Sequence, residues 1–256
     1  MNQVRPARQQ RSSFSWRPLK LVNRIREVQQ LYRMGKQEVS DRVYFTLAEV
    51  HQCAKFLHED FGLKLEGLDI LEVGPGRLLE HLRALSVKNR VTGIDMEIIP
   101  QGEDWSDYVE LLRHSPVPRT AQAVMRKLLG GDTLFEKSLA QTFGVEGFAR
   151  LPVLRMDPTR MTFPEASFDF VCSWSAFENI QRPQSALEEV VRVLRPGGIA
   201  YLLIHLDEGR LDAWKQMFQE TMPGMRFSQE RYEDLRTVCL IGRWQKPRSE
   251  VGGGVS

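Results

Sequence analysis

Residues 68–76 read Leu-Asp-Ile-Leu-Glu-Val-Gly-Pro-Gly, an apolar strand that runs directly into a glycine turn. A helical pattern follows at once, so the segment predicts a strand–turn–helix corner. Gly74 and Gly76 let the backbone bend and leave no Cβ in the way of a ligand, and the helix N-terminus offers unpaired N–H groups. Such a corner is typical of nucleotide sites, although tight strand-to-helix turns also use glycine for structural reasons alone.

A second predicted strand, Val91 to Asp95, ends in an acid about 20 residues further on. A carboxylate there can accept hydrogen bonds from both hydroxyls of a ribose. Leu79 occupies the position of the third glycine of a dinucleotide fingerprint, and an acid, Glu72, closes the first strand. A pyrophosphate would be repelled by Glu72, whereas a cationic methionine moiety tolerates it. Both features favour S-adenosylmethionine over NAD, and an NAD-dependent oxidoreductase is the alternative enzyme.

Short apolar runs bounded by Gly, Pro and Asp alternate with helical stretches along the chain. The predicted strands are Ile70–Val73, Val91–Ile94, Val153–Leu154, Phe168–Cys172 and Ile199–Ile204, and the predicted helices are Leu47–Phe61, Leu78–Leu85 and Ala186–Leu194. This alternation predicts an α/β fold with a doubly wound, mostly parallel sheet. Phe227–Tyr232 and Val238–Trp244 add an antiparallel hairpin at the sheet edge.

The 256 residues suit one α/β domain with additions. Residues 1–40 form a basic, partly disordered arm, residues 41–248 the domain with a helical insertion at 100–147, and residues 249–256 a flexible tail. Seven basic residues precede the first acid, Glu27: Arg5, Arg8, Arg11, Arg17, Lys20, Arg24 and Arg26. The arm is interpreted as a solvated tail, with a weak contact to an anionic surface or an organelle transit peptide as alternatives.

The composition excludes several classes of protein. Lys and Arg number 35 against 33 Asp and Glu, so the net charge gives no strong evidence for a nucleic-acid partner. No apolar run of about 18 residues is present, which predicts no transmembrane segment and a cytoplasmic location. Cys53, Cys172 and Cys239 are widely separated and lack the spacing of metal ligands, so no metal site is predicted.

Three later stretches complete a known pattern: Leu154–Asp157, Ser167–Ser173 and Val191–Gly198, the last reading Val-Arg-Val-Leu-Arg-Pro-Gly-Gly. Together with the glycine corner they resemble the class I S-adenosylmethionine-dependent methyltransferases, small-molecule branch, over about Leu68 to His205. The resemblance implies a seven-stranded Rossmann-like sheet with S-adenosylmethionine as cofactor. It also implies cofactor contacts from seven residues: Glu72, Gly74 and Gly76 at the methionine end, Asp95 at the ribose, Met96 and Asp157 at the adenine, and Ser173 near the sulfonium.

Some positions depart from the family pattern. Pro158 stands where a backbone N–H usually meets the adenine, and proline has none. Asn179 replaces a histidine that relatives often carry. These departures leave open a binding protein that has kept the fold without catalysis. Pro196 to Gly198 are expected to have a structural role, ending the helix before the fifth strand.

His205, at the end of the fifth strand, is the candidate catalytic residue because such strand ends face the ligand crevice. A structural, hydrogen-bonded histidine is the alternative, while His51, His58 and His81 are placed on helix surfaces. The stretch after the fourth strand lacks the Asp-Pro-Pro-Tyr motif of many nucleobase amino methyltransferases, which favours a small-molecule or glycan acceptor and O-methylation. The aromatic residues of the insertion line its pocket or form the insertion's own core: Trp105, Tyr108 and Phe135.

Overall fold

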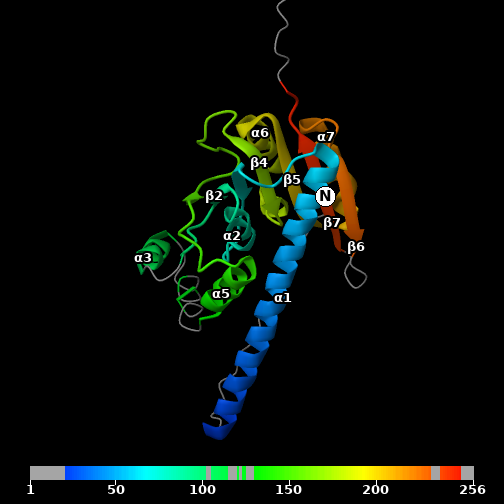
Figure 1. Cartoon of the computed structure of the whole chain (residues 1–256). Helices are drawn as coiled ribbons and strands as arrows, with labels where there is room; N and C mark the ends of the chain where they lie inside the picture. Colours follow the sequence, from blue (N-terminus) through cyan, green and yellow to red (C-terminus); the bar gives the residue numbers. More distant parts are fainter. Residues whose placement is uncertain are drawn as a thin grey trace, which may run out of the picture. The chain divides into compact units, whose positions relative to one another are not determined.

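The computed structural model describes residues 21–101, 105–114, 120, 123–124, 130–231 and 237–248 (Figure 1). The chain divides into two compact units, residues 1–38 and 39–256. Of the first unit, the described residues 21–38 are helical and belong to α1 (Leu21–Phe61). Residues 1–20 of the expected basic arm and residues 249–256 of the expected tail lie outside the described residues.

Within the described residues, seven strands form one sheet in the order β3-β2-β1-β4-β5-β7-β6. The first five are parallel, and β7 pairs antiparallel with both β5 and β6. The strands are β1 (Asp69–Val73), β2 (Arg90–Asp95), β3 (Val153–Arg155), β4 (Phe168–Trp174), β5 (Leu194–Asp207), β6 (Arg226–Arg231) and β7 (Thr237–Gln245). The predicted fold class is confirmed, with β6 at the edge of the sheet.

Helices cover both faces of this sheet. One face packs on α6 (Pro183–Val193) and α7 (Leu211–Thr221), and the other on α2 (Glu80–Ser86) and the C-terminal part of α1. The expected insertion, residues 100–147, contains α3 (Trp105–His114) and α5 (Gly131–Phe143), and α5 packs Phe135 against Val43 of α1. Two short 3-10 helices, η1 (Phe177–Asn179) and η2 (Glu208–Arg210), follow β4 and β5.

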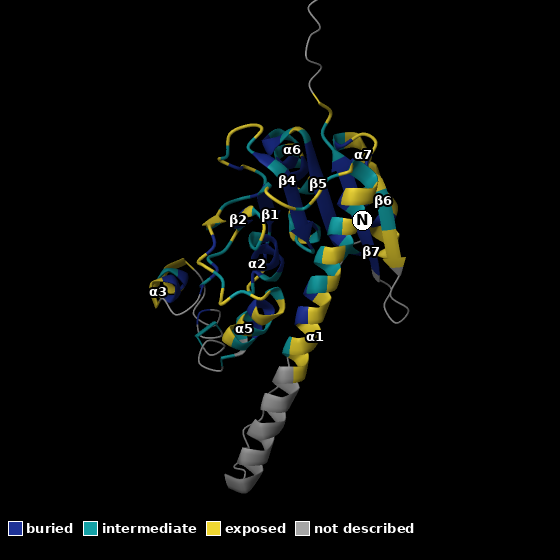
Figure 2. Ribbon diagram, viewed as in Figure 1, coloured by how far each residue is buried: buried dark blue, intermediate teal, exposed yellow. Residues whose placement is uncertain are grey.

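The central strands are buried, as Figure 2 shows for β4 and β5 in dark blue. Side chains alternate between the two faces of a strand. In β1, Leu71 and Val73 belong to the core beneath α6 and α7, whereas Ile70 belongs to the core beneath α1 and α2. The same alternation places Glu72 on the α1/α2 face. An ionisable side chain is thereby built into an apolar layer.

Several predicted helix ends differ from the structure, and α1 begins at Leu21 rather than Leu47. α2 begins at Glu80 rather than Leu78, because Leu79 has the left-handed backbone conformation, with φ of 51°. α6 ends at Val193, before the Pro-Gly-Gly expected to end it. The glycines there pair with the chain after β7: the Gly197 N–H donates to the Lys246 carbonyl at 2.9 Å. Pro-Gly-Gly therefore opens β5 as part of the sheet.

An ion-pair cluster fixes the C-terminal end of α1 to the last two strands. Asp60 accepts hydrogen bonds from Arg243 Nε at 2.6 Å and from Arg226 Nη1 at 2.8 Å. Burial alone would raise the pKa of Asp60, but these hydrogen bonds outweigh it and the pKa is lowered. The Arg243 guanidinium is buried and also lies over the Phe56 ring at 4.1 Å. Gly62 ends the helix, with φ of 66° and its N–H on the His58 carbonyl, as the sequence predicted.

Candidate functional site

The two glycines of the corner after β1 have different tasks. Both have positive φ, 70° at Gly74 and 68° at Gly76, where a side chain is strained. A Cβ on Gly74 would lie 2.3 Å from the Cβ of Ala176, so the loop after β4 occupies the space above it. A Cβ on Gly76 would meet nothing within 4 Å. Gly74 therefore allows the close approach of Ala176 from the loop after β4, whereas the space beside Gly76 is open.

Two cavities meet at the carboxyl ends of the parallel strands. The larger, of about 490 Å³, is lined from β1, β2 and the loops after β3 and β4, including Gly74, Asp95, Met96, Asp157, Thr159 and Ser175. The smaller, of about 230 Å³, lies between the glycine corner and the insertion and is lined by Gly76, Asp95, Tyr108 and Leu111 among others. Asp95 lines both cavities. Carboxyl ends of strands are the usual ligand position in open α/β sheets.

Asp95 is positioned by its own turn. Its Oδ1 accepts a hydrogen bond from the Glu97 N–H at 3.0 Å, and its carbonyl accepts one from the Met156 N–H at 2.8 Å. These contacts hold Asp95 at the end of β2, where it lines both cavities. Met96, the next residue, is 59% exposed and lines the larger cavity, an unusual position for an apolar side chain unless a ligand covers it.

Asp157 lies across the larger cavity, after β3. Its Oδ1 accepts hydrogen bonds from the backbone N–H and the hydroxyl of Thr159, both at 2.8 Å. These two bonds lower the pKa of Asp157, so the group is a carboxylate at neutral pH. Pro158 also lines the cavity and offers it no N–H donor.

Ser173 and Ser175 point to different parts of the molecule. Ser173 is fully buried, and its hydroxyl donates to the Val73 carbonyl at 2.8 Å. Ser175, two residues later, lines the larger cavity, and its Oγ lies 2.6 Å from Nδ1 of His205. Ser175 has a φ of 58° and is held by its N–H on the Leu203 carbonyl at 2.8 Å. A strained non-glycine residue beside a cavity is a common feature of functional sites.

His205 approaches the cavity through Ser175, because the cavity lining includes the serine but not the histidine. The His205 backbone N–H donates to Oε1 of Glu178 at 3.5 Å. Burial raises the pKa of the Glu178 carboxyl, and its Oε2 has no hydrogen-bond partner within the described part of the chain. A hydroxyl, an imidazole and a carboxyl therefore gather at the ends of β4 and β5.

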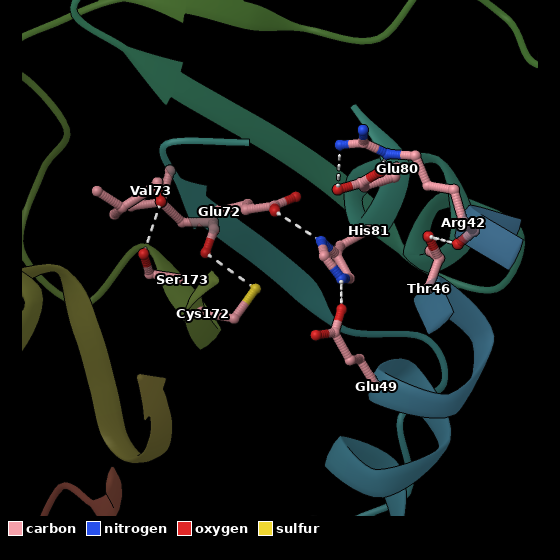
Figure 3. A network of polar contacts seen from close by, with 10 residues as sticks. Arg42, Thr46, Glu49, Glu72, Val73, Glu80, His81, Cys172 and Ser173 are labelled. Atoms are coloured by element: carbon pink, nitrogen blue, oxygen red, sulfur yellow. Dashed lines mark hydrogen bonds and ion pairs between the residues drawn. The ribbon is translucent and has the colours of Figure 1, made fainter. Parts of the chain in front are cut away.

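Glu72 lies behind the glycine corner and outside the lining of both cavities. Its side chain is 1% exposed, and neither carboxylate oxygen has a hydrogen-bond partner among the residues that the structure describes. Burial raises the pKa of Glu72 well above its usual value, and the nearby Glu80 raises it further. The imidazole of His81 is close to it, with Nδ1 3.9 Å from Glu72 Oε1 (Figure 3). The prediction that His81 lies on a helix surface is wrong, since His81 is buried.

The structure thus places Gly74, Asp95, Met96 and Asp157 around one cavity, with Gly76 in the adjoining one. Ser175 was not predicted as a site residue, because the apolar run indicated a strand that ends at Cys172, whereas β4 continues to Trp174. Other lining residues that the sequence analysis did not single out are Thr159, Ile180, Gln181 and Arg182.

The insertion aromatics divide between core and cavity. Tyr108 lines the smaller cavity, Phe135 is buried against α1, and Trp105 is 54% exposed. Within the described residues, no group of three His, Cys, Asp or Glu side chains could hold a metal ion. No described helix is long and apolar enough to cross a membrane.

Residues 121–202 match the family model of a methyltransferase domain. The match includes β3, β4 and α6 and lies after the glycine corner and Asp95. No curated protein matches the sequence. The family match confirms the prediction of a methyltransferase, and S-adenosylmethionine as the predicted cofactor agrees with it.

Solved structures share the fold at low identity. The [4+2]-cyclase SpnF is 14% identical, with a TM-score of 0.50 over 77% of this chain and 81% of that chain. The 1,6-didemethyltoxoflavin-N1-methyltransferase of Burkholderia thailandensis is 14% identical, with a TM-score of 0.49 over 91% and 93% of the two chains. The N-methyltransferase NodS of Bradyrhizobium japonicum WM9 is 14% identical, with a TM-score of 0.48 over 79% and 97%. Because the first of these is named as a cyclase, the shared fold alone does not define the reaction.

Proposed function

We propose that this methyltransferase binds S-adenosylmethionine across the two cavities that meet at Asp95 and methylates a hydroxyl group of a small-molecule or sugar-containing acceptor. The observation that carries the proposal is the placement of Asp95. Its carboxylate lies at the end of β2, between a cavity lined by Met96 and Asp157 and a second cavity that reaches Gly76. A ribose with its two hydroxyls suits that position, with an adenine on one side.

The residues present fit such a cofactor. The larger cavity, of about 490 Å³, is within the range of small-molecule sites. Asp95 would accept hydrogen bonds from the ribose, the exposed Met96 side chain would pack on the adenine, and Asp157 would face the adenine amino group. Glu72, in its ionised form, would act on the methionine end as a buried negative charge. When bound, the cofactor supplies a methyl group already activated by its sulfonium.

The chain's own residues would then position the acceptor and take its proton. Ser175 lines the larger cavity, and its hydroxyl lies at hydrogen-bond distance from His205 Nδ1. As an acceptor hydroxyl is methylated, its proton passes to Ser175 Oγ while the serine proton moves to His205 Nδ1. General-base assistance of this kind contributes typically about 10²- to 10⁴-fold. We therefore infer that His205 acts as the base through Ser175.

Isothermal titration with S-adenosylhomocysteine and with NAD tests the cofactor. We expect binding of the first and none of the second. Binding of NAD alone would contradict the proposal and support an oxidoreductase. Binding of neither ligand would also contradict it.

Transfer is tested by incubating the protein and isotopically labelled S-adenosylmethionine with a small-molecule extract and identifying the labelled products by mass spectrometry. The proposal predicts a labelled O-methyl product, at a rate that falls about 100-fold or more in His205→Gln. His58→Gln is the control, because His58 is exposed on α1. Tight cofactor binding without any labelled product would instead indicate a binding protein. A labelled N- or C-methyl product would overturn O-methylation.

A further inference from the structure

A chain of three ionisable side chains, two of them buried, connects α1 with β1 behind the glycine corner (Figure 3). His81 Nε2 lies 2.7 Å from Glu49 Oε2, and His81 Nδ1 lies 3.9 Å from Glu72 Oε1. His81 lies on α2, Glu49 on α1 and Glu72 on β1. His81 and Glu72 are buried, whereas the Glu49 side chain is 37% exposed. We call these residues the Glu49–His81–Glu72 chain.

The His81 ring is fixed on its flat side as well as at its edges. It stacks on the Trp174 ring with the centroids 4.2 Å apart and an angle of 3° between the planes. Trp174 ends β4, and the next residue, Ser175, lines the larger cavity. A hydrogen bond to the Glu49 carboxylate requires a proton on Nε2, so Nδ1 is the nitrogen that faces Glu72. The ring has a defined orientation between two carboxylates.

Glu72 requires such a neighbour. A buried carboxylate without hydrogen bonds is costly in its charged form and takes up a proton unless a cation is close. Among the residues that the structure describes, the charged or titratable groups that act on Glu72 are His81 and Glu80 from α2 and Cys172 from β4. Of these, only the imidazole can carry a positive charge. His81 is therefore the neighbour able to keep Glu72 ionised.

Glu72 also adjoins the cavity without entering it. The two residues that follow it, Val73 and Gly74, line the larger cavity, while its own side chain lies on the opposite side of the strand. A charge on Glu72 would act on the cavity through the buried interior, where its attraction for a cation is stronger than in water. The cationic end of the proposed cofactor, with its ammonium group, is the ligand chemistry that this charge favours.

We propose that His81, oriented by Glu49 and Trp174, is a positioning residue that holds Glu72 as a charged carboxylate for the amino-acid end of the cofactor. The inference rests on the proposed function, since it concerns the same site. It also gives α1 a part in binding, because Glu49 lies on that helix. Substituting His81 should weaken only ligands that carry the ammonium group.

The test compares two ligands by calorimetry. S-adenosylhomocysteine carries the α-amino group, whereas 5′-methylthioadenosine has the same adenosine but no amino-acid part. In His81→Gln we expect about tenfold weaker binding of S-adenosylhomocysteine, with binding of 5′-methylthioadenosine within about twofold of the unaltered chain. His58→Gln serves as the control and should change neither affinity.

Two further measurements separate positioning from structure. Without the imidazole, Glu72 should stay protonated to higher pH, so the pH at which S-adenosylhomocysteine binding strengthens should move upward in His81→Gln. In the Glu72→Gln background, His81→Gln should add no further loss of affinity. If His81→Gln does not fold, Glu49→Gln replaces it, because that side chain is partly exposed, and the same selective loss is expected.

An equal loss for both ligands would show a merely structural role and overturn the inference. No loss for either ligand would overturn it as well. Failure of the proposed function is distinguishable, because the unaltered chain would then bind neither ligand. In that case the inference fails together with the function.

Discussion

Asp95→Ala should weaken cofactor binding by about 100-fold. The Asp95 carboxylate lines both cavities, and we place it against the two ribose hydroxyls. A hydrogen bond to a charged group contributes about 1.5 kcal/mol at the lower end of its range, so losing two costs about 3 kcal/mol. Since about 1.4 kcal/mol corresponds to a factor of ten, the loss is on the order of 100-fold in Kd. Asp95→Asn keeps an acceptor oxygen but loses the charge, and about a tenfold loss is expected.

Isothermal titration with S-adenosylhomocysteine measures the effect. Asp212→Ala is the matched control, because Asp212 is exposed on α7 and lines neither cavity. Asp95 also accepts the Glu97 N–H, so a thermal melt should accompany each titration. A folded Asp95→Ala variant whose affinity stays within about threefold of the unaltered chain would refute the ribose role. The cofactor would then have to bind elsewhere or in another register.

Three further predictions concern the glycine corner, the ion pair that fixes α1, and the buried carboxyl of Glu72. Gly74→Ala should lower the free energy of unfolding in urea by about 3 kcal/mol, because the new Cβ overlaps Ala176 and the backbone is left-handed. Gly76→Ala has only the left-handed backbone to oppose it and should lower this free energy by about 1 kcal/mol. Equal losses for the two variants would contradict this explanation. Asp60→Ala should cost about 3 kcal/mol in the same assay, because a buried guanidinium loses its partner, and a loss below about 1 kcal/mol would argue against the anchor. The affinity for S-adenosylhomocysteine should rise with pH as Glu72 ionises, because only the carboxylate attracts the ammonium group. Burial raises the pKa of Glu72, so this rise should occur above the usual range of a glutamate. Glu72→Gln should remove the pH dependence, and an unchanged pH profile in that variant would count against this role.

Much of the fold follows from local sequence. Apolar runs between Gly, Pro and Asp marked the five parallel strands, because strands covered on both faces of a sheet need continuous apolar side chains. The start of α1 could not be predicted in this way. The residues from Leu21 onward carry many polar side chains and no apolar stripe strong enough to separate a helix from a solvated arm.

Site residues that directly follow a predicted strand could be predicted from the sequence. Asp95 and Asp157 follow their strands directly, and both line the larger cavity. Ser175 was missed because the predicted strand stopped before Ser173. In the structure Ser173 is buried within β4, and its hydroxyl donates to the carbonyl of Val73 on the neighbouring strand, so its polarity does not end the strand. His81 was misplaced because its burial depends on α1, a partner 32 residues away at Glu49.

The contact between Asp60 and Arg243 joins residues 183 positions apart. During synthesis α1 leaves the ribosome well before β7, so Asp60 is made long before the guanidinium of Arg243 that fixes it. Until β7 arrives, β5 keeps an open edge and Asp60 stays in water. Closing such a long loop is slow, and exposed strand edges promote association between chains. A chain that stops before β7 therefore loses the antiparallel edge of the sheet and the anchor of α1 together.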